Sequence, residues 1–301
     1  HADRLLLEAK LFHKPDYNIC TLGRLKYFES IVVDANVFLQ GPYEIPGVPK
    51  MFDKLRVNDL IPEDSPYDEP ALNYSFVKVE NFVDEDVDPM LWLEDDGNDA
   101  IVDWVWLELQ NNLNAVVATR SALLQRDGDI VDVDGTSSVE FPDTYIGSYK
   151  LMVRHRNHLG ARTLNLIDYT LGFSANPVDF SNPATPLFGV IDNNLKGPVK
   201  LLEAGVNGLW AGNTNLDKDT PPPFETFRYI VKYNGDLNDR LAILNKLGGV
   251  PSAVLNGYHL EDVNLNGQVK YNGDGNDRLI ILNNVGASFP NRTIKQQPPI
   301  H

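Results

Sequence analysis

The feature that most constrains the fold of this chain is a duplication near its C-terminal end. Residues 232–248 read KYNGDLNDRLAILNKLG, and residues 270–286 read KYNGDGNDRLIILNNVG, so that 13 of 17 aligned positions are identical. The two copies are separated by an offset of 38 residues. Self-similarity of this kind indicates two copies of one small structural unit.

Each copy is predicted to end in a short helix. In the second copy, Asn276 or Asp277 can cap the helix, and Gly286 stands where helices commonly stop. Apolar residues recur at helical spacing and predict one buried face. They are Leu279, Leu282 and Val285 in the second copy and Leu241, Leu244 and Leu247, followed by Gly248, in the first.

A calcium loop is predicted just before the second helix, where residues 262–269 read DVNLNGQV. Oxygen-bearing side chains at positions 1, 3 and 5 and glycine at position 6 form the first half of an EF-hand-type loop, because Ca²⁺ takes six to eight oxygen ligands and the glycine allows a sharp turn. Position 12, which is normally acidic, is Gly273, and the closing acid falls four residues later. The predicted ligands are Asp262, Asn264, Asn266, Gln268 and Asp277.

The first copy carries a weaker version of the same loop. Its predicted ligands are Asn213, Asn215, Asp217 and Asp239, the first three of which lie 49 residues before their counterparts. An 11-residue insertion at about residues 219–230 separates this loop from its helix, and Lys218 replaces the glycine. The alternative interpretation of both loops is that clustered Asn, Asp and Gly form turns that bind no ion.

Two tandem loop–helix copies resemble the dockerin module, the paired calcium-loop domain of secreted bacterial proteins. The resemblance covers residues 209–290 and depends on the D-x-N-x-N-G half-loop, the duplication and the helices. The stretched second loop departs from the dockerin pattern. The resemblance implies a dockerin-like module at 206–301 that binds Ca²⁺.

The preceding region, residues 31–205, is predicted to be an antiparallel β-sandwich, so that the fold class is mainly β. Strand candidates include residues 31–39, 101–109, 115–125 and 145–156, with turn signals between them. The 101–109 segment alternates, with Trp104 and Trp106 on one side. Trp210 lies at the junction with the duplication, without a Ser/Gly linker, which predicts that the two regions pack together.

A wider resemblance involves ordered segments of the chain, among them VFLQGPY, IVDWVWLELQ, VVATRSALLQRDGDIVDVDG and LWAGN. Together with the second repeat, they are similar to the C-terminal region of large secreted surface proteins of gliding-type Gram-negative bacteria, often exported by type IX secretion. The resemblance covers about residues 31–290. It implies an extracellular, cell-surface location and an adhesin-like role.

Composition excludes several classes of partner. Asp and Glu number 42 against 26 Lys and Arg, which gives a net charge of −16 and makes nucleic acid and anionic membranes unfavourable partners. Cys20 is the single cysteine, so no intrachain disulfide framework exists. No apolar stretch approaches the 18 residues of a membrane-spanning helix, so membrane insertion is not expected.

Candidate catalytic and binding groups are few. His155 and His158 would face opposite sides of a strand and could share a metal ion only if the chain turned between them, so a structural polar cluster is favoured. Acids at 127, 129, 132 and 134 could serve glycoside hydrolysis, although such clusters are typical of hairpin ends. No motif for a catalytic triad, a zinc protease or a phosphate loop is present, so we expect a non-enzymatic protein.

The sequence therefore predicts a calcium-stabilised structural or adhesive surface protein. The alternative is an accessory carbohydrate-binding module of a secreted degradative enzyme, in which Trp104 and Trp106 would stack on sugar rings. Residues 1–30 form an apolar N-terminal extension that must be buried, either on its own sandwich or by strand addition to the next copy. Addition to the next copy would build a homo-oligomeric filament.

Overall fold

The computed structural model describes residues 30–44, 47–68, 72, 74, 76–77, 87, 97–169, 177–191, 196–215 and 229–296. The predicted assembly segment, residues 1–30, lies outside the described residues except for its last member, and so does Asp217. Within the described part, no helix is long and apolar enough to cross a membrane.

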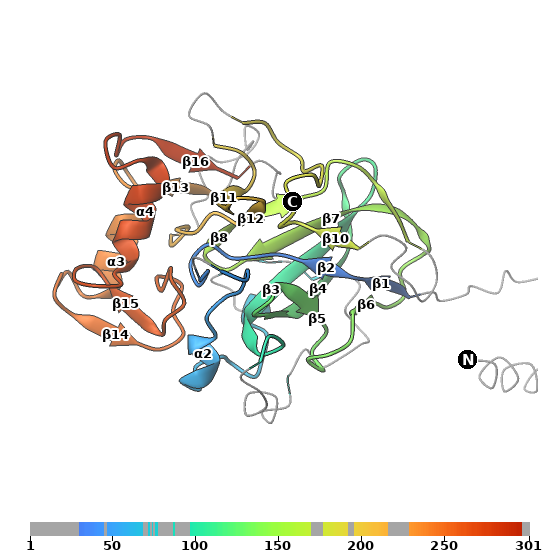
Figure 1. Ribbon diagram of the computed structural model, residues 1–301, viewed down its shortest axis with the longest axis horizontal. Helices are drawn as coiled ribbons and strands as arrows, with labels where there is room; N and C mark the ends of the chain where they lie inside the picture. The colour runs from blue at the N-terminus through green and yellow to red at the C-terminus, as the bar shows by residue number, and fades with distance from the viewer. Residues whose placement is uncertain are drawn as a thin grey trace, which may run out of the picture.

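The centre of the molecule is an eight-stranded sheet that curls into a half-barrel (Figure 1). Its order is β10-β2-β5-β4-β3-β7-β8, with β9 paired to β7, and every pair except β10–β2 is antiparallel. The predicted mainly β class is confirmed. The strands are β2 (Ala35–Asn36), β3 (Ile101–Gln110), β4 (Val116–Gln125), β5 (Asp129–Val131), β7 (Gly147–His155), β8 (His158–Arg162), β9 (Ile167–Tyr169) and β10 (Val178–Asp179).

Short elements surround this sheet. The strands β1 (Ile31–Val33) and β6 (Val139–Phe141) pair with each other, as do β11 (Lys200–Glu203) and β12 (Val206–Gly208). A single helical turn, α2 (Lys54–Val57), and a 3-10 turn, η1 (Pro66–Asp68), lie between β2 and β3 in the chain.

The strand β3 is buried along its whole length, on both of its faces. Its second face is covered by the segment that precedes it. Trp104 Nε1 donates to Pro62 O at 2.9 Å, and Tyr67, Tyr74 and Phe76 all pack against Trp106. Both tryptophans are therefore core residues and are not available to stack on a sugar.

The duplication forms two interlocked strand–helix–strand units (Figure 1). The first contains β13 (Ile230–Lys232), α3 (Asp239–Lys246) and β14 (Val254–Asn256), and the second contains β15 (Gln268–Lys270), α4 (Asp277–Val285) and β16 (Thr293–Lys295). The last strand of each unit pairs with the first strand of the other, because β14 pairs with β15 and β16 pairs with β13. Each copy therefore supplies a strand to a two-stranded sheet of the other copy. The resemblance to a dockerin remains a prediction.

The helices begin where the sequence predicts. Asn238 and Asn276 are the N-caps, and the side chain of Asn276 accepts a bond from Leu279 N at 3.0 Å. The C-cap of α4 is Gly286, with φ 95°, as predicted. The predicted buried face is wrong at one equivalent position in each helix, because Leu241 and Leu279 are exposed. The buried apolar residues of the two helices and their ends are Ile243, Leu247, Ile281 and Val285.

The sheet and the duplication pack together, which confirms the prediction made from Trp210. One buried cluster joins Leu159 of β8 and Trp210 to the apolar residues of the duplication, among them Ile243 and Ile281. Leu265, from the second loop, belongs instead to the core of the sheet. Each core thus contains side chains from the other region.

Candidate metal centre

The second predicted calcium loop is organised around the carboxylate of Asp277, the first residue of α4. Its Oδ1 accepts bonds from Val263 N at 2.7 Å and from Asn264 N at 3.3 Å, and its Oδ2 accepts one from Lys270 N at 2.8 Å. One side chain therefore joins the start of the loop, strand β15 and helix α4. The four extra residues that the sequence shows in this loop do not prevent Asp277 from reaching it.

Asp262 closes the other side of the same loop. Its Oδ1 accepts from Asn266 N at 3.1 Å and its Oδ2 from Gly267 N at 2.7 Å. Gly267 has φ 82°, and a Cβ there would also lie 2.7 Å from a methyl group of Leu60, so the position requires glycine. The side chains of Asn264 and Asn266 bond main-chain N–H groups two residues ahead, at 3.1 and 2.9 Å, and curl the loop.

The two carboxylates are buried without a neutralising ion pair among the described residues. Burial raises the pKa of Asp277 to about 8, with a further contribution from the nearby charge of Asp262. Burial also raises the pKa of Asp262 to about 6, although Arg156 and the main-chain donors act in the opposite direction. Two acids in one buried loop favour either a bound proton or a bound cation.

The donor set fits Ca²⁺ better than a transition metal. The loop supplies two carboxylates and amide oxygens, which are hard oxygen ligands. In the described part of the chain, no group of three His, Cys, Asp or Glu side chains is arranged to hold a metal ion. The predicted ligand Gln268 does not contribute its side chain, since Gln268 Nε2 donates to Asn256 Oδ1 at 3.1 Å in the β14–β15 hairpin.

The first loop repeats this framework around Asp239. Asp239 Oδ1 accepts from Thr214 N at 2.8 Å and its Oδ2 from Lys232 N at 2.6 Å, which are the contacts of Asp277 displaced by one copy. Asn215 donates to Leu237 O, as Asn264 donates to Gly275 O. Asn213 is buried where the second loop has Asp262, so the described part of the first loop lacks the second buried carboxylate; Asp217, which corresponds to Asn266, lies outside the described residues.

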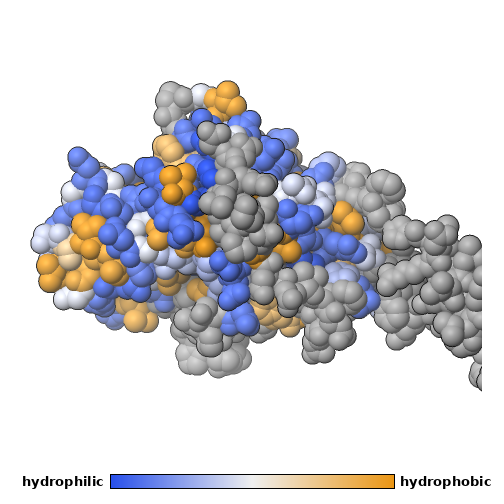
Figure 2. Space-filling model, turned by 90° about the horizontal axis from the view of Figure 1, so that it is seen from below, coloured by the Kyte–Doolittle hydropathy of each residue, from blue (hydrophilic) through white to orange (hydrophobic). Residues whose placement is uncertain are grey.

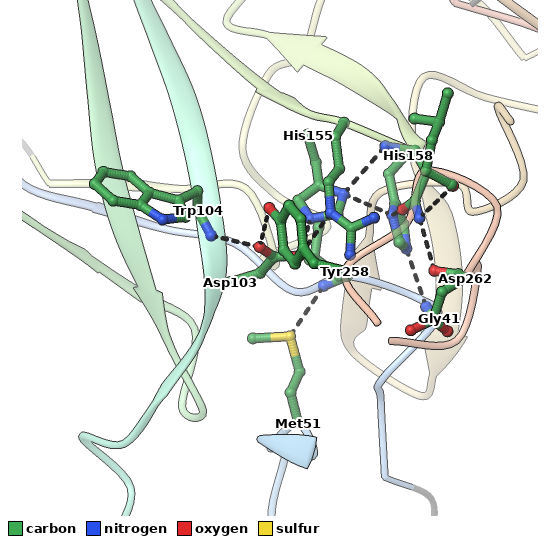
Figure 3. Close-up of polar contacts among 12 residues, drawn as sticks. Gly41, Met51, Asp103, Trp104, His155, His158, Tyr258 and Asp262 are labelled. Atoms are coloured by element: carbon green, nitrogen blue, oxygen red, sulfur yellow. Dashed lines mark hydrogen bonds and ion pairs between the residues drawn. The ribbon is translucent and has the colours of Figure 1, made fainter. Parts of the chain in front are cut away.

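A buried polar junction adjoins the second loop, and sequence reasoning found only its histidines (Figure 3). At its centre, Asp103 Oδ1 accepts from Tyr258 Oη at 2.7 Å, while Oδ2 accepts from Arg156 Nε and contacts His155 Nε2, both at 3.0 Å. Burial raises the pKa of Asp103, but Arg156 and His155 outweigh it and hold that pKa at about 2. The available signal was a single acid inside the apolar run IVDWVW.

The two histidines meet because the chain turns at residues 156–157. Their Nδ1 atoms lie 3.0 Å apart, and His158 Nε2 accepts from Gly41 N at 3.1 Å. We therefore assign the Nδ1–H tautomer to His158 and the Nε2–H tautomer to His155, which donates to Asp103. Burial lowers the pKa of both imidazoles. All four ring nitrogens have partners, so the pair acts as a structural cluster.

The junction also holds the second loop in place. Asn157 Nδ2 donates to Leu260 O at 3.0 Å and to Asp262 O at 2.8 Å, and Arg156 Nη1 donates to His259 O. The turn between β7 and β8 is therefore hydrogen-bonded to the main chain that leads into the loop. Figure 3 shows Asp262 next to His158 and Gly41.

The acids considered for hydrolysis have structural partners. Asp132 forms a 2.6 Å ion pair with Arg120, and Asp134 accepts bonds from Thr136 and Ser137 N–H groups in its own turn. Asp129 accepts from Asn36 Nδ2 at 3.0 Å. These contacts are those of hairpin ends, as the sequence favours.

Comparison with known proteins adds no relative to this description. No protein-family model, no curated protein and no solved structure matches the chain.

Proposed function

We propose that this chain is a calcium-stabilised, non-enzymatic extracellular protein that acts in surface structure or adhesion. The observation that carries the proposal is the pair of buried carboxylates, Asp262 and Asp277, in a loop with the D-x-N-x-N-G pattern. A divalent cation would remove the repulsion between them, and secreted bacterial surface proteins work where calcium is abundant. The resemblance to type IX-exported surface proteins supports the location.

Calcium binding would stabilise the whole chain rather than the duplication alone. Asn157 connects the loop to the central sheet, and the two regions share buried clusters. A ligand that binds only the folded state raises its stability by mass action, by about 2.7 kcal/mol at one hundred times Kd. Asp262, Asn264, Asn266 and Asp277 would supply side-chain oxygens, and Gln268 would supply its main-chain carbonyl.

The test is thermal unfolding of the full chain with CaCl₂, with MgCl₂ and with EGTA. We expect calcium to raise Tm, and we expect Asp262→Ala and Asp277→Ala each to abolish most of the rise. Asn213→Ala, the matched change in the first loop, should have a smaller effect. A Tm that chelator leaves unchanged would refute calcium binding and leave the turn interpretation.

Self-assembly is a separate part of the proposal and depends on residues 1–30. Their apolar content motivates strand addition to the next copy, which would generate a filament. Deleting residues 1–30 should then leave a folded monomer, while the full chain assembles in light-scattering measurements. If the deletion unfolds the protein and the full chain is monomeric, the segment is an internal strand and the filament idea is wrong.

A further inference from the structure

A groove of ≈ 300 Å³ lies between the second loop, helix α4 and the start of α2. Its volume is at the lower end of known small-molecule sites. It is distinct from the Asp262–Asp277 pair, although Asn264 and Asn266 of the same loop form part of its wall. Other lining residues are Phe52, Lys54, Asn276, Leu279 and Asn283.

The groove is nearly free of charge on a strongly acidic protein. Among its lining residues, the one charged side chain is Lys54, whose ammonium lies 4.9 Å from the centre of the Phe52 ring. The whole chain carries a net charge of −16. A lining with so little charge does not complement a strongly charged anion and instead suits a neutral ligand.

The polar groups that are free to bond a ligand in the groove are side-chain amides. Asn266 uses its Oδ1 within the loop, and no described partner engages its Nδ2. Asn283, on the helix side, is exposed and has no hydrogen bond to another described residue. An amide offers both donors and acceptors, which is what a ligand rich in hydroxyl groups requires.

Apolar surface lies beside these amides. Phe52 is 41% exposed and Leu279 is 47% exposed, so both present uncovered surface to the groove. Figure 2, a view from below, shows small hydrophobic groups among hydrophilic residues at the left of the molecule, the side on which Figure 1 has the duplication. An aromatic ring and an aliphatic side chain next to free amides match the alternating C–H and hydroxyl surfaces of a pyranose ring.

We propose that this groove binds a neutral oligosaccharide, with the sugar packed on Phe52 and Leu279 and its hydroxyl groups bonded to Asn266 and Asn283. The site differs from the tryptophan pair in β3, which is buried. It goes beyond the proposed structural function and does not require it. Because Asn266 belongs to both the loop and the groove, calcium should strengthen sugar binding by ordering the loop.

The experiment is isothermal titration of the full chain with cellotetraose, xylotetraose, mannotetraose and tetra-N-acetylchitotetraose, each in calcium and in EGTA. We expect at least one to bind with a Kd on the order of 0.1–1 mM, since a shallow groove buries little of its ligand. Phe52→Ala and Asn283→Ala should each weaken binding by about tenfold. Phe289→Ala, which removes an aromatic ring that is 54% exposed outside the groove, should leave it unchanged.

The proposal is overturned if none of the four sugars binds at 10 mM, or if Phe52→Ala and Asn283→Ala both bind as the unchanged protein does. The titrations in calcium and in EGTA distinguish the sugar-binding proposal from the proposal that the second loop binds calcium. Sugar binding that persists in EGTA, together with a Tm that does not respond to calcium, would support the groove and refute the calcium loop.

Discussion

The sharpest consequence of the Asp262–Asp277 pair is an unusual dependence of stability on pH when calcium is absent. Asp277 has a folded-state pKa of about 8 against an ordinary value of 3.8. Below pH 8 the folded chain therefore retains a proton that the unfolded chain has released. Folding stability must fall as pH rises between these two values, because the folded state binds more protons.

The size of the effect follows from that difference. At 1.36 kcal/mol per pKa unit, an ionised Asp277 costs the fold roughly 6 kcal/mol relative to the unfolded chain. Between pH 6.5 and 8 the loss is roughly 1.5–2 kcal/mol, which lowers Tm by about 3–8 °C for a domain of this size. Asp262, whose pKa is about 6, is mostly ionised throughout this window. Histidines of the unfolded chain, with an ordinary pKa of 6.5, still release protons at its lower end, and this opposing gain in stability is shared by the control variant described below.

Calcium should reverse the trend. A cation in the loop takes the place of the proton, so that Tm in calcium stays level or rises over the same window, and calcium affinity increases with pH. The assay is thermal unfolding followed by circular dichroism at pH 6.5, 7, 7.5 and 8, in EGTA and in CaCl₂.

Asp277→Asn is the matched control, because its side chain is uncharged at every pH. The variant will be less stable, since its amide places a donor against Lys270 N–H, but the slope of Tm with pH is the quantity compared. If the unchanged protein in EGTA shows a Tm that is level or rises from pH 6.5 to 8, and matches the slope of Asp277→Asn, the reasoning is refuted.

Three further predictions concern the polar junction. Gly41→Ala should lower the free energy of unfolding in urea by about 1–3 kcal/mol, because the added Cβ would overlap Val263 O. Gly197→Ala is the control, since its Cβ meets only ordinary contacts and should cost little; equal costs would contradict this. Asn157→Ala leaves Leu260 O and Asp262 O without their donor, so it should lower the free energy of unfolding by about 1–3 kcal/mol and weaken the calcium binding measured by calorimetry. Asn182→Ala, at an exposed position, should do neither, and an unchanged calcium affinity in Asn157→Ala would argue against this anchor. Because burial lowers the pKa of His158, the calcium-loaded protein should lose stability as pH falls below 6.5, where the imidazole takes up a proton in the unfolded chain but not in the folded one. His158→Gln should reduce the loss of Tm between pH 7 and 5. An identical loss in the variant would show that another group is responsible.

The location of the duplicated loops was predictable because their chemistry is local. The Asn caps, the glycine after α4 and the spacing of Asp262, Asn264 and Asn266 all act over a few residues, so their positions can be read from the chain. The mainly β class was predictable for the same reason, since strands with period-2 alternation and turn residues are local patterns.

The contacts between distant segments could not be read in this way. The alternation in β3 placed Trp104 and Trp106 on one side, but it did not show that Pro62 and Tyr67, about forty residues earlier in the chain, cover that side. The pairing of β13 with β16 joins strands separated by both α3 and α4, which no local pattern encodes. The groove is likewise formed by Phe52 and Leu279, which lie more than two hundred residues apart in the chain.

By itself, then, the sequence determined which short segments form strands, helices and candidate ion-binding loops, because caps, turns and periodicity are properties of neighbouring residues. Only the tertiary structure decided that Asp103, His155 and His158 form one hydrogen-bonded chain, and that Asn157 ties it to the loop of Asp262. The physical reason is that burial creates these interactions. A carboxylate, an imidazole or an amide bonds water in the unfolded chain, and it needs a particular distant partner only once packing has removed that water.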